Sequence, residues 1–432
     1  MPLRSLAAAA VTLAALAGVP AAEAAWSQGV VFWAGEPHDV RGFVDRAGAV
    51  RWSAAPSWPN GAPRPGRAQW RTRTPQGRPS PPVALASVHP TLEVDGAGRG
   101  LAMWPGCGTP ARLCVRRRAP SGAPLGPPFA VSQPSASQGG FGGRAFGIGG
   151  EVDDAGNAVF LWMKSGAPGA FFRVMHADGR LEPPEALPAA DPGSAVVRVG
   201  PDGSLALAWT EHGRIVVMTG STSGRRDPPR PIPMIGEPPQ AFATEVGPAG
   251  TAVVAWVQGA RAQPNGNFPD LRGDLHVAAA RAGAPFVAQR LSAGRAPAVP
   301  PGLAIATTGA AMVTWAEASP TGTIEPGREH TAIAAAYAPD GVSFGATGRL
   351  ARSSDAVGFP VVAFDDGGDA VVAWEVYARL SVVAALFRAG RGFERAARLG
   401  HGTGLHAAGG GQRTLVVSWL EGNVASTAIR RP

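Results

Sequence analysis

Four glutamates stand just after a tryptophan, a recurrent position at which carboxylates could do chemistry. Glu211, Glu317 and Glu421 lie two positions past a tryptophan, and Glu375 lies one position past its own. Two carboxylates about 5 to 10 Å apart can act as acid and base in glycoside cleavage. Strand-end glutamates are more often solvated or paired with arginine, so that interpretation stands beside the catalytic one.

Ligand-binding residues are expected near the same rim, with His212 and Arg144 as candidates. No HExxH, no GxSxG and no clustered Asp loop occurs, and the eight histidines are scattered. The glycine-rich stretch around Gly147, Gly149 and Gly150 runs into a predicted strand, whereas a phosphate cradle needs a helix N-terminus. The sequence therefore predicts no metal site and no cofactor.

Cys107 and Cys114 are the only cysteines. A local disulfide is the leading interpretation for an exported protein, since two thiols with no histidine nearby make a poor zinc site.

The elements that position these residues follow from a repeat marked by tryptophan. Seven copies share an apolar, β-branched segment that ends in Trp104, Trp162, Trp209, Trp256, Trp315, Trp374 and Trp419. A glycine stands six positions earlier in six copies, namely Gly98, Gly156, Gly203, Gly250, Gly309 and Gly368, and Arg413 takes this place in the seventh. Successive tryptophans are roughly 45 to 59 residues apart, a period typical of propellers and solenoids.

Each copy predicts four antiparallel strands. Turn signals such as VDGAG and GPDG precede the glycine, which indicates strand, turn, strand. A third apolar segment follows the tryptophan and a weaker fourth follows in most copies, the composition of a propeller blade. The sequence thus predicts an all-β, seven-bladed β-propeller over residues 82–432, with the tryptophans packed between blades. The last copy lacks a fourth strand, so we expect an N-terminal strand at residues 82–87 to pair with the C-terminal strands and close the ring.

Two segments precede the predicted propeller. Arg4, the apolar residues 5–19 and the small-residue site at Ala22 and Ala24 predict a signal peptide over residues 1–24. Residues 25–81 are interpreted as a hairpin segment followed by a Pro/Arg-rich linker. We expect a monomer, secreted or held at the cell envelope, with no transmembrane segment once the signal is removed.

The net charge says little about the binding partner. The net charge of +8 permits contact with acidic glycans, envelope polymers or nucleic acid without identifying one, and we expect no specific nucleic-acid binding.

The segment VDDAGNAVFLW at residues 152–162 resembles the repeats of secreted bacterial propellers, which are similar in outline to sialidase-like and WD40-like propellers. The resemblance covers residues 82–432 and implies the propeller fold. Sialidases carry Asp boxes of the form SxDxGxTW and a Tyr/Glu nucleophile pair. This sequence has no such box, and its two tyrosines, Tyr337 and Tyr377, lie in or beside repeated strand segments.

Two functions of different classes follow. The first is a non-catalytic binding or scaffolding propeller that recognises a glycan, an envelope polymer or a protein through its variable-loop face. The alternative is a glycan-cleaving hydrolase or lyase that uses the glutamates named above.

Overall fold

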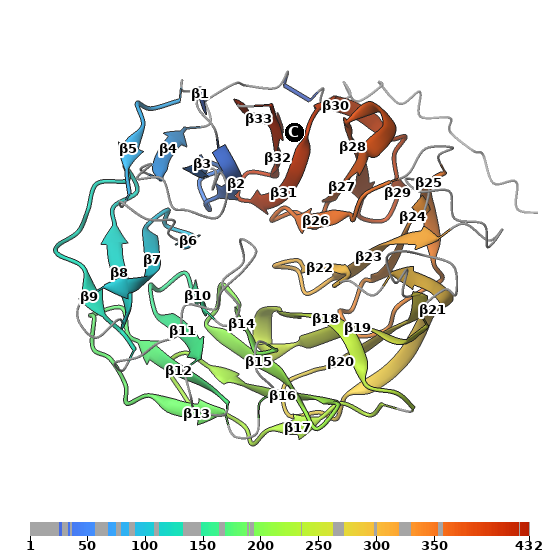
Figure 1. The fold of residues 1–432 in the computed structure, drawn as a ribbon, viewed down its shortest axis with the longest axis horizontal. Helices are drawn as coiled ribbons and strands as arrows, with labels where there is room; N and C mark the ends of the chain where they lie inside the picture. The colour runs from blue at the N-terminus through green and yellow to red at the C-terminus, as the bar shows by residue number, and fades with distance from the viewer. Residues whose placement is uncertain are drawn as a thin grey trace, which may run out of the picture.

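The structure is a computed structural model, and its sheets form a ring. It describes residues 26–27, 33–34, 37–56, 68–74, 79–85, 91–107, 112–132, 148–163, 169–187, 190, 194–234, 236–261, 272–297, 300–318, 330–352, 357–422 and 424–431. These residues form eight antiparallel sheets around one axis (Figure 1).

The first four blades follow one another along the chain, each running from an inner to an outer strand. Blade 1 contains β2 (Pro37–Val44), β3 (Val50–Pro56), β4 (Gln69–Arg73) and β5 (Val83–Ala84). Blade 2 contains β6 (Thr91–Val94), β7 (Gly100–Cys107), β8 (Arg112–Arg118) and β9 (Phe129–Ala130). Blade 3 contains β10 (Ile148–Val152), β11 (Ala158–Met163), β12 (Ala170–Met175) and β13 (Glu185–Leu187). Blade 4 contains β14 (Val196–Val199), β15 (Ser204–Glu211), β16 (Arg214–Ser221) and β17 (Arg230–Pro231).

The last four blades complete the ring. Blade 5 contains β18 (Pro239–Val246), β19 (Ala252–Arg261), β20 (Arg272–Ala280) and β21 (Val287–Pro297). Blade 6 contains β22 (Gly302–Ile305), β23 (Ala311–Ala318), β24 (His330–Ala338) and β25 (Gly348–Arg352). Blade 7 contains β26 (Val361–Phe364), β27 (Ala370–Val376) and β28 (Ser381–Arg388), with β29 (Gly392–Phe393) and β30 (Ala397–His401) both paired to β28. Blade 8 contains β31 (Thr403–Gly410), β32 (Thr414–Glu421), β33 (Val424–Arg430) and β1 (Trp33–Ala34).

The prediction of a propeller with four-stranded antiparallel blades is confirmed, but the predicted number of seven blades is wrong. The additional blade is blade 1, which takes most of its strands from the segment interpreted as a hairpin and linker. Its tryptophan, Trp52, lies two residues before the repeat position, which Ala54 occupies. Because side chains alternate along a strand, both residues face the same way, and both are buried.

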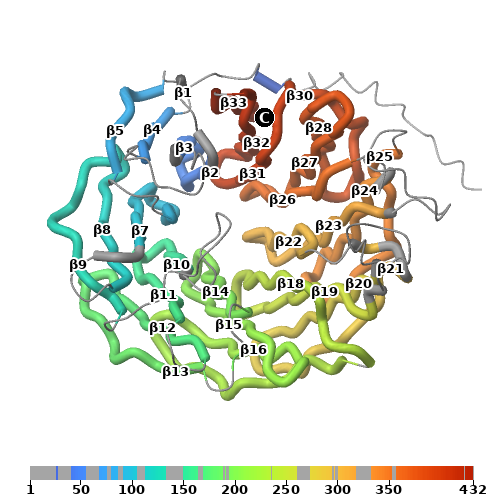
Figure 2. The backbone as a smooth tube through the Cα atoms, viewed as in Figure 1, coloured from blue at the N-terminus to red at the C-terminus, as the bar shows by residue number. Residues whose placement is uncertain are grey.

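The predicted closing strand is also corrected. Residues 83–84 form β5, which pairs with β4 inside blade 1. The strand that joins the two ends of the chain is β1, where Trp33 pairs with Ala425 and Ala34 with Val424. Figure 2 shows the first and last blades, in blue and red, side by side. The ring therefore closes through an N-terminal strand in the outer position of the last blade.

An apolar core fills each of the eight interfaces between neighbouring blades. The second-strand tryptophan of a blade packs toward the preceding blade, as Trp162 does with Leu101 and Met103. The repeat tryptophans are 0 to 2% exposed, apart from the partly buried Trp104. These indole rings account for the recurrence of the motif.

The repeat glycines form the turns between the first and second strands, where all six have a φ between +74° and +93°. An L side chain is strained there, which favours glycine. A buried aspartate opens several of these turns. Asp153 accepts hydrogen bonds from the Asn157 backbone N–H at 2.8 Å and from the Thr222 hydroxyl at 2.7 Å, which ties this turn of blade 3 to the end of the third strand of blade 4.

The two ends of the ring differ in construction. The turns between first and second strands all lie at one end, which we call the turn face, and are short, as at residues 95–99, 153–157 and 200–203. Backbone hydrogen bonds join neighbouring turns, including Arg46 N–H to Gly96 O at 3.0 Å and Asp154 N–H to Pro201 O at 3.1 Å. The opposite end, the loop face, carries the connections from second to third strands and from blade to blade, including residues 262–271 and 319–329.

Loss of β1 should destabilise the ring. Ser27 exchanges hydrogen bonds with Ile429 at 3.0 to 3.2 Å, and Trp26 packs against the core between blades 7 and 8. We expect a chain that starts at residue 37 to lose at least about 2 kcal/mol of unfolding free energy relative to one that starts at residue 25, measured by urea denaturation. A Gly-Ser replacement of residues 28–32, which keeps both contacting segments, is the control. Equal midpoints for the truncated and control chains would show that β1 does not close the ring.

Within the described part of the chain, no helix is long and apolar enough to cross a membrane.

Candidate functional site

The four candidate glutamates lie at the loop-face ends of second strands in different blades, 4, 6, 7 and 8. Glu211 Oε2 lies 3.4 Å from Trp209 Nε1, and Glu421 Oε2 accepts a hydrogen bond from the Ser426 hydroxyl at 3.3 Å. The other two contact charged or backbone donors. Arg349 Nε donates to Glu317 at 2.7 Å, and the Gly404 N–H donates to Glu375 at 2.7 Å.

No hydrogen bond or ion pair among the described residues joins two of these glutamates. Burial raises the pKa of Glu375, against the hydrogen bonds that it accepts from backbone N–H groups. Three of the glutamates share a position in the repeat and Glu375 lies one residue earlier, but their contacts tie each one to its own blade or to the next. Their arrangement is that of separate rim residues.

The other sequence candidates are dispersed. The His212 side chain is 85% exposed and its Nδ1 lies 3.9 Å from Glu211 Oε1. Arg144 and the side chain of Cys107 lie outside the described residues. Cys114 lies in β8, next to β7, which ends at Cys107, so the disulfide stays a prediction.

A charged cluster that the sequence interpretation missed lies on the inner strands near the axis. Four residues stand five positions before a repeat glycine in consecutive blades: Glu93, Glu151, Arg198 and Glu245. Arg198 Nη1 lies 2.8 Å from Glu151 Oε1, and its Nε lies 2.9 Å from Glu245 Oε1. One arginine thus links the inner strands of blades 3, 4 and 5.

The cluster is completed from blade 1, where Arg41 Nη1 lies 3.9 Å from Glu93 Oε1. Glu151 also accepts a hydrogen bond from the Val199 backbone N–H at 2.6 Å. Three carboxylates therefore face two guanidinium groups. The equivalent inner-strand positions of blades 6 to 8 hold Ala304, Ala363 and Ala408, so the charge is confined to one side of the ring.

Burial sets the protonation of these carboxyls. It raises the pKa of Glu93 to about 8, helped by the negative charge of Glu151 and opposed by Arg41 and Arg198. Burial also raises the pKa of Glu245 to about 7 and that of Glu151, both against the pull of Arg198. Burial opposes the charge of Arg198, yet Glu151 and Glu245 raise its pKa overall. The arginine stays charged while Glu93 is largely protonated at neutral pH.

These shifts predict a pH-dependent stability. A carboxyl whose pKa is higher in the folded than in the unfolded chain stabilises the fold less as the pH rises from about 4.5 toward 8. We expect Glu93→Gln to raise the unfolding free energy at pH 8 by roughly 1 to 3 kcal/mol and to change it little at pH 5. Urea denaturation at both pH values measures this, with Glu237→Gln, an exposed glutamate, as the control. A variant less stable than the parent at pH 8 would refute the assignment.

The cluster does not resemble a metal site, and the described residues contain no group of three or more His, Cys, Asp or Glu side chains placed to hold a metal ion.

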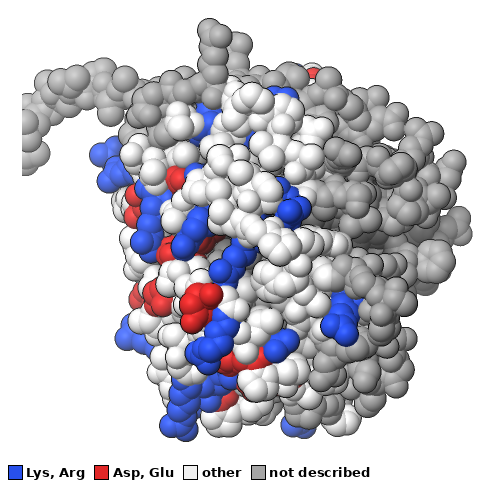
Figure 3. Space-filling model, turned by 90° about the vertical axis from the view of Figure 1, so that its left-hand side faces the viewer, with Lys and Arg blue, Asp and Glu red and all other residues white. Residues whose placement is uncertain are grey.

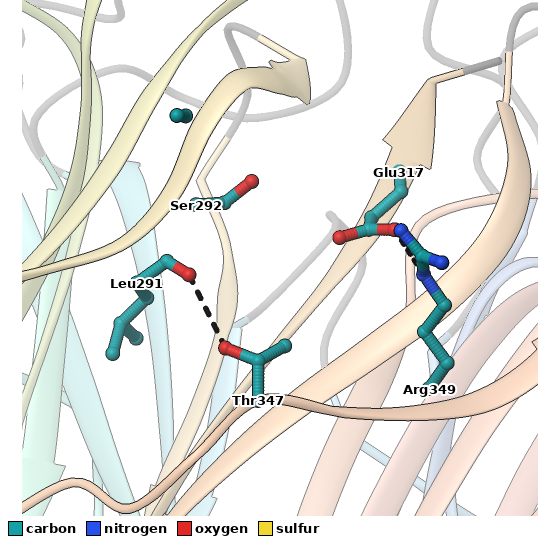
Figure 4. Close-up of a pocket in the computed structure, with 6 residues that line it drawn as sticks. Leu291, Ser292, Glu317, Thr347 and Arg349 are labelled. Atoms are coloured by element: carbon teal, nitrogen blue, oxygen red, sulfur yellow. Dashed lines mark hydrogen bonds and ion pairs between the residues drawn. The ribbon is translucent and has the colours of Figure 1, made fainter. Parts of the chain in front are cut away.

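A pocket of about 430 Å³ lies between blades 5 and 6, toward the loop face. Its walls come from the outer strand β21, from the end of β23 and from the start of β25 (Figure 4). The lining residues are Leu291, Ser292, Ala293, Glu317, Thr347 and Arg349. Glu317 is therefore the one sequence candidate among them that lines a cavity found in the described part of the chain.

On the face that Figure 3 shows, basic and acidic side chains are interspersed. Several arginines of the described surface are paired. Arg226 contacts both Glu182 and Glu185, and Arg388 contacts both Asp369 and Glu394. Part of the basic charge on this surface is therefore balanced locally by acidic partners.

The fold defines a class of protein, the β-propellers, and comparison with known proteins takes the identification no further. No protein-family profile and no curated protein matches the chain. Among solved structures, the chain is similar to a Dos1 propeller, with 9% identity, a TM-score of 0.49 and coverage of 93% of this chain and 94% of that one. It is also similar to the Cps50 (Swd1) β-propeller domain of Myceliophteria thermophila, with 10% identity, a TM-score of 0.45 and coverage of 93% and 98%. These likenesses concern the fold alone.

Proposed function

We propose that this chain is an exported, non-catalytic binding or scaffolding propeller that recognises a glycan, an envelope polymer or a protein through its loop face. The signal sequence expected at residues 1–24 supports export. A repetitive scaffold that carries variable connections at one end is a common design for binding proteins.

The contrast between the two faces carries this proposal. The turns between first and second strands are short, and main-chain hydrogen bonds such as Gly411 N–H to Asp45 O and Asp366 N–H to Gly410 O join them from blade to blade. Connections at the loop face differ in length and sequence between blades. The loop-face connections therefore present a surface that differs from blade to blade.

The proposal is tested by applying residues 25–432 to neutral, sialylated, sulfated and uronic glycans and to isolated cell-wall polymers, at low and physiological salt. We expect at least one defined structure to stay bound at physiological salt. Release by salt from every polyanion would mean that the net charge alone explains the contact.

Two matched variants locate the binding face. One replaces residues 262–271, the connection from β19 to β20 at the loop face, by a Gly-Ser linker. The other replaces residues 282–285, in the turn from β20 to β21 at the opposite end, by a Gly-Ser linker as long as the segment that it replaces. Binding should be weakened by the first change alone. The proposal fails if only the second change weakens it.

One observation favours the alternative, a glycan-cleaving enzyme. Burial raises the pKa of Glu375, and a raised pKa is what a general acid requires. Glycan turnover that Glu375→Gln abolishes while the chain stays folded would establish the enzyme. The same turnover assay on Glu211→Gln, Glu317→Gln and Glu421→Gln would identify a second carboxylate.

A further inference from the structure

The pocket between blades 5 and 6 indicates which class of ligand the protein binds, an inference that rests on the proposed binding function. Thr347 Oγ1 donates a hydrogen bond to the Leu291 carbonyl at 3.2 Å, so the two blades are joined beneath the cavity. The pocket is therefore built into the blade interface and does not depend on a single surface side chain. Its volume of about 430 Å³ lies within the usual range for small-molecule sites.

Glu317 is the central polar group of this pocket. Its side chain is only 8% exposed, and Arg349 Nε contacts one of its oxygens at 2.7 Å. Figure 4 shows Glu317 and Ser292 facing each other across the cavity, with the Arg349 guanidinium beside one carboxylate oxygen. The second carboxylate oxygen has no protein donor among the described residues. A largely buried acceptor in a cavity favours a ligand that donates a hydrogen bond to it.

Charge and hydrogen-bonding capacity define the ligand. The negative charge of Glu317 and the positive charge of Arg349 balance, so an anionic ligand would meet the carboxylate and a cationic one the guanidinium. A hydroxyl group suits both, since it donates to Glu317 and accepts from Arg349. Leu291 and Ala293 add a small apolar surface beside these polar groups.

We infer that this pocket binds adjacent hydroxyl groups of a neutral sugar residue. One hydroxyl donates to the open oxygen of Glu317, and its neighbour accepts from the terminal nitrogens of Arg349. Ser292 can donate to or accept from a third hydroxyl on the opposite wall. Sugar C–H groups lie against Leu291 and Ala293.

The experiment titrates residues 25–432 with the methyl glycosides of glucose, galactose and mannose, followed by saturation-transfer NMR. Glucuronate and glucosamine serve as charged counterparts. We expect a neutral glycoside to bind with a Kd of about 1 mM and both charged sugars to bind at least about tenfold more weakly. The inference is overturned if no neutral glycoside binds, or if a charged sugar binds more tightly than all of them.

Variants assign the binding to this pocket. Ala293→Trp fills the cavity from an exposed wall and leaves the Glu317 and Arg349 pair intact, so loss of binding does not require loss of folding. Glu317→Gln removes the charge of the acceptor. Each should weaken binding at least about tenfold, whereas Glu185→Gln, on the outer strand β13 of blade 3, should bind as the parent does. Unchanged binding by Ala293→Trp would place the sugar elsewhere.

The two proposals fail separately. If Ala293→Trp keeps both glycoside and array binding while the replacement of residues 262–271 abolishes array binding, the loop-face function stands and the pocket assignment is wrong. If no array ligand binds but methyl glycosides bind and Ala293→Trp blocks them, the pocket assignment stands and the wider function needs revision.

Discussion

Replacing Arg198 by methionine lowers the free energy of unfolding by roughly 1 to 3 kcal/mol at pH 8, and by clearly less at pH 5. Arg198 contacts Glu151 at 2.8 Å and Glu245 at 2.9 Å. Without it, two carboxylates near the axis lose a positive partner. Burial raises both pKa values, that of Glu245 to about 7, so these carboxyls carry less charge at pH 5 and the penalty for an unpaired charge falls.

Denaturation in urea at the two pH values measures this difference. Arg281→Met serves as the control, since Arg281 is exposed and its loss should change the stability by less than about 0.5 kcal/mol. An equal loss at both pH values for Arg198→Met would show that the residue acts through packing, and the account of the cluster as a charge-balanced link between blades would be wrong.

Replacing Trp374 by alanine should cost about 3 to 5 kcal/mol. The indole is 1% exposed and fills the interface between blades 6 and 7, where it belongs to one core with Met312 and Val372. Truncation removes the largest side chain of that interface and leaves a cavity between two sheets. The other second-strand tryptophans occupy equivalent places, so the same change at Trp162 should have a similar cost.

Equilibrium denaturation measures the loss for Trp374→Ala. Val287→Ala is the matched control, because Val287 is 70% exposed and its truncation removes little buried surface. A loss below about 1 kcal/mol for Trp374→Ala would contradict the view that these tryptophans hold adjacent blades together.

The repeat made most of the fold predictable. A glycine with positive φ and a tryptophan six positions later mark the second strand of blades 2 to 7. Each of these blades has the same type of turn before this strand and places its tryptophan at the interface with the preceding blade. Blade 1 departs from this spacing. Trp52 reaches its interface from two positions earlier, and Trp70, on the third strand, packs on blade 2. A search for the fixed glycine–tryptophan spacing therefore misses blade 1, whose buried tryptophans stand at other positions.

The charged cluster had a signal in the sequence that the tryptophan alignment did not use. Glu151 and Glu245 each lie 47 residues from Arg198, so all three occupy one column of the repeat. Alignment on the glycines would have brought them together on neighbouring inner strands. Their raised pKa values depend on burial in the assembled ring, which no local pattern reports.

The pocket between blades 5 and 6 is a different case. Ser292 and Arg349 occupy fourth-strand segments of neighbouring blades, where the repeat is weakest. Glu317 was found as a rim carboxylate, but its partner Arg349 depends on the register of β25 against β24. Long-range pairing of irregular outer strands therefore determines this site, and the sequence pattern does not.

Binding without turnover is the central claim. We would incubate residues 25–432 with each glycan of the panel at physiological salt, recover the bound fraction and compare glycan masses before and after by mass spectrometry. The account predicts that at least one glycan is retained and that its mass is unchanged. A shortened or unsaturated product formed by the parent chain and lost in Glu375→Gln would contradict it and identify an enzyme.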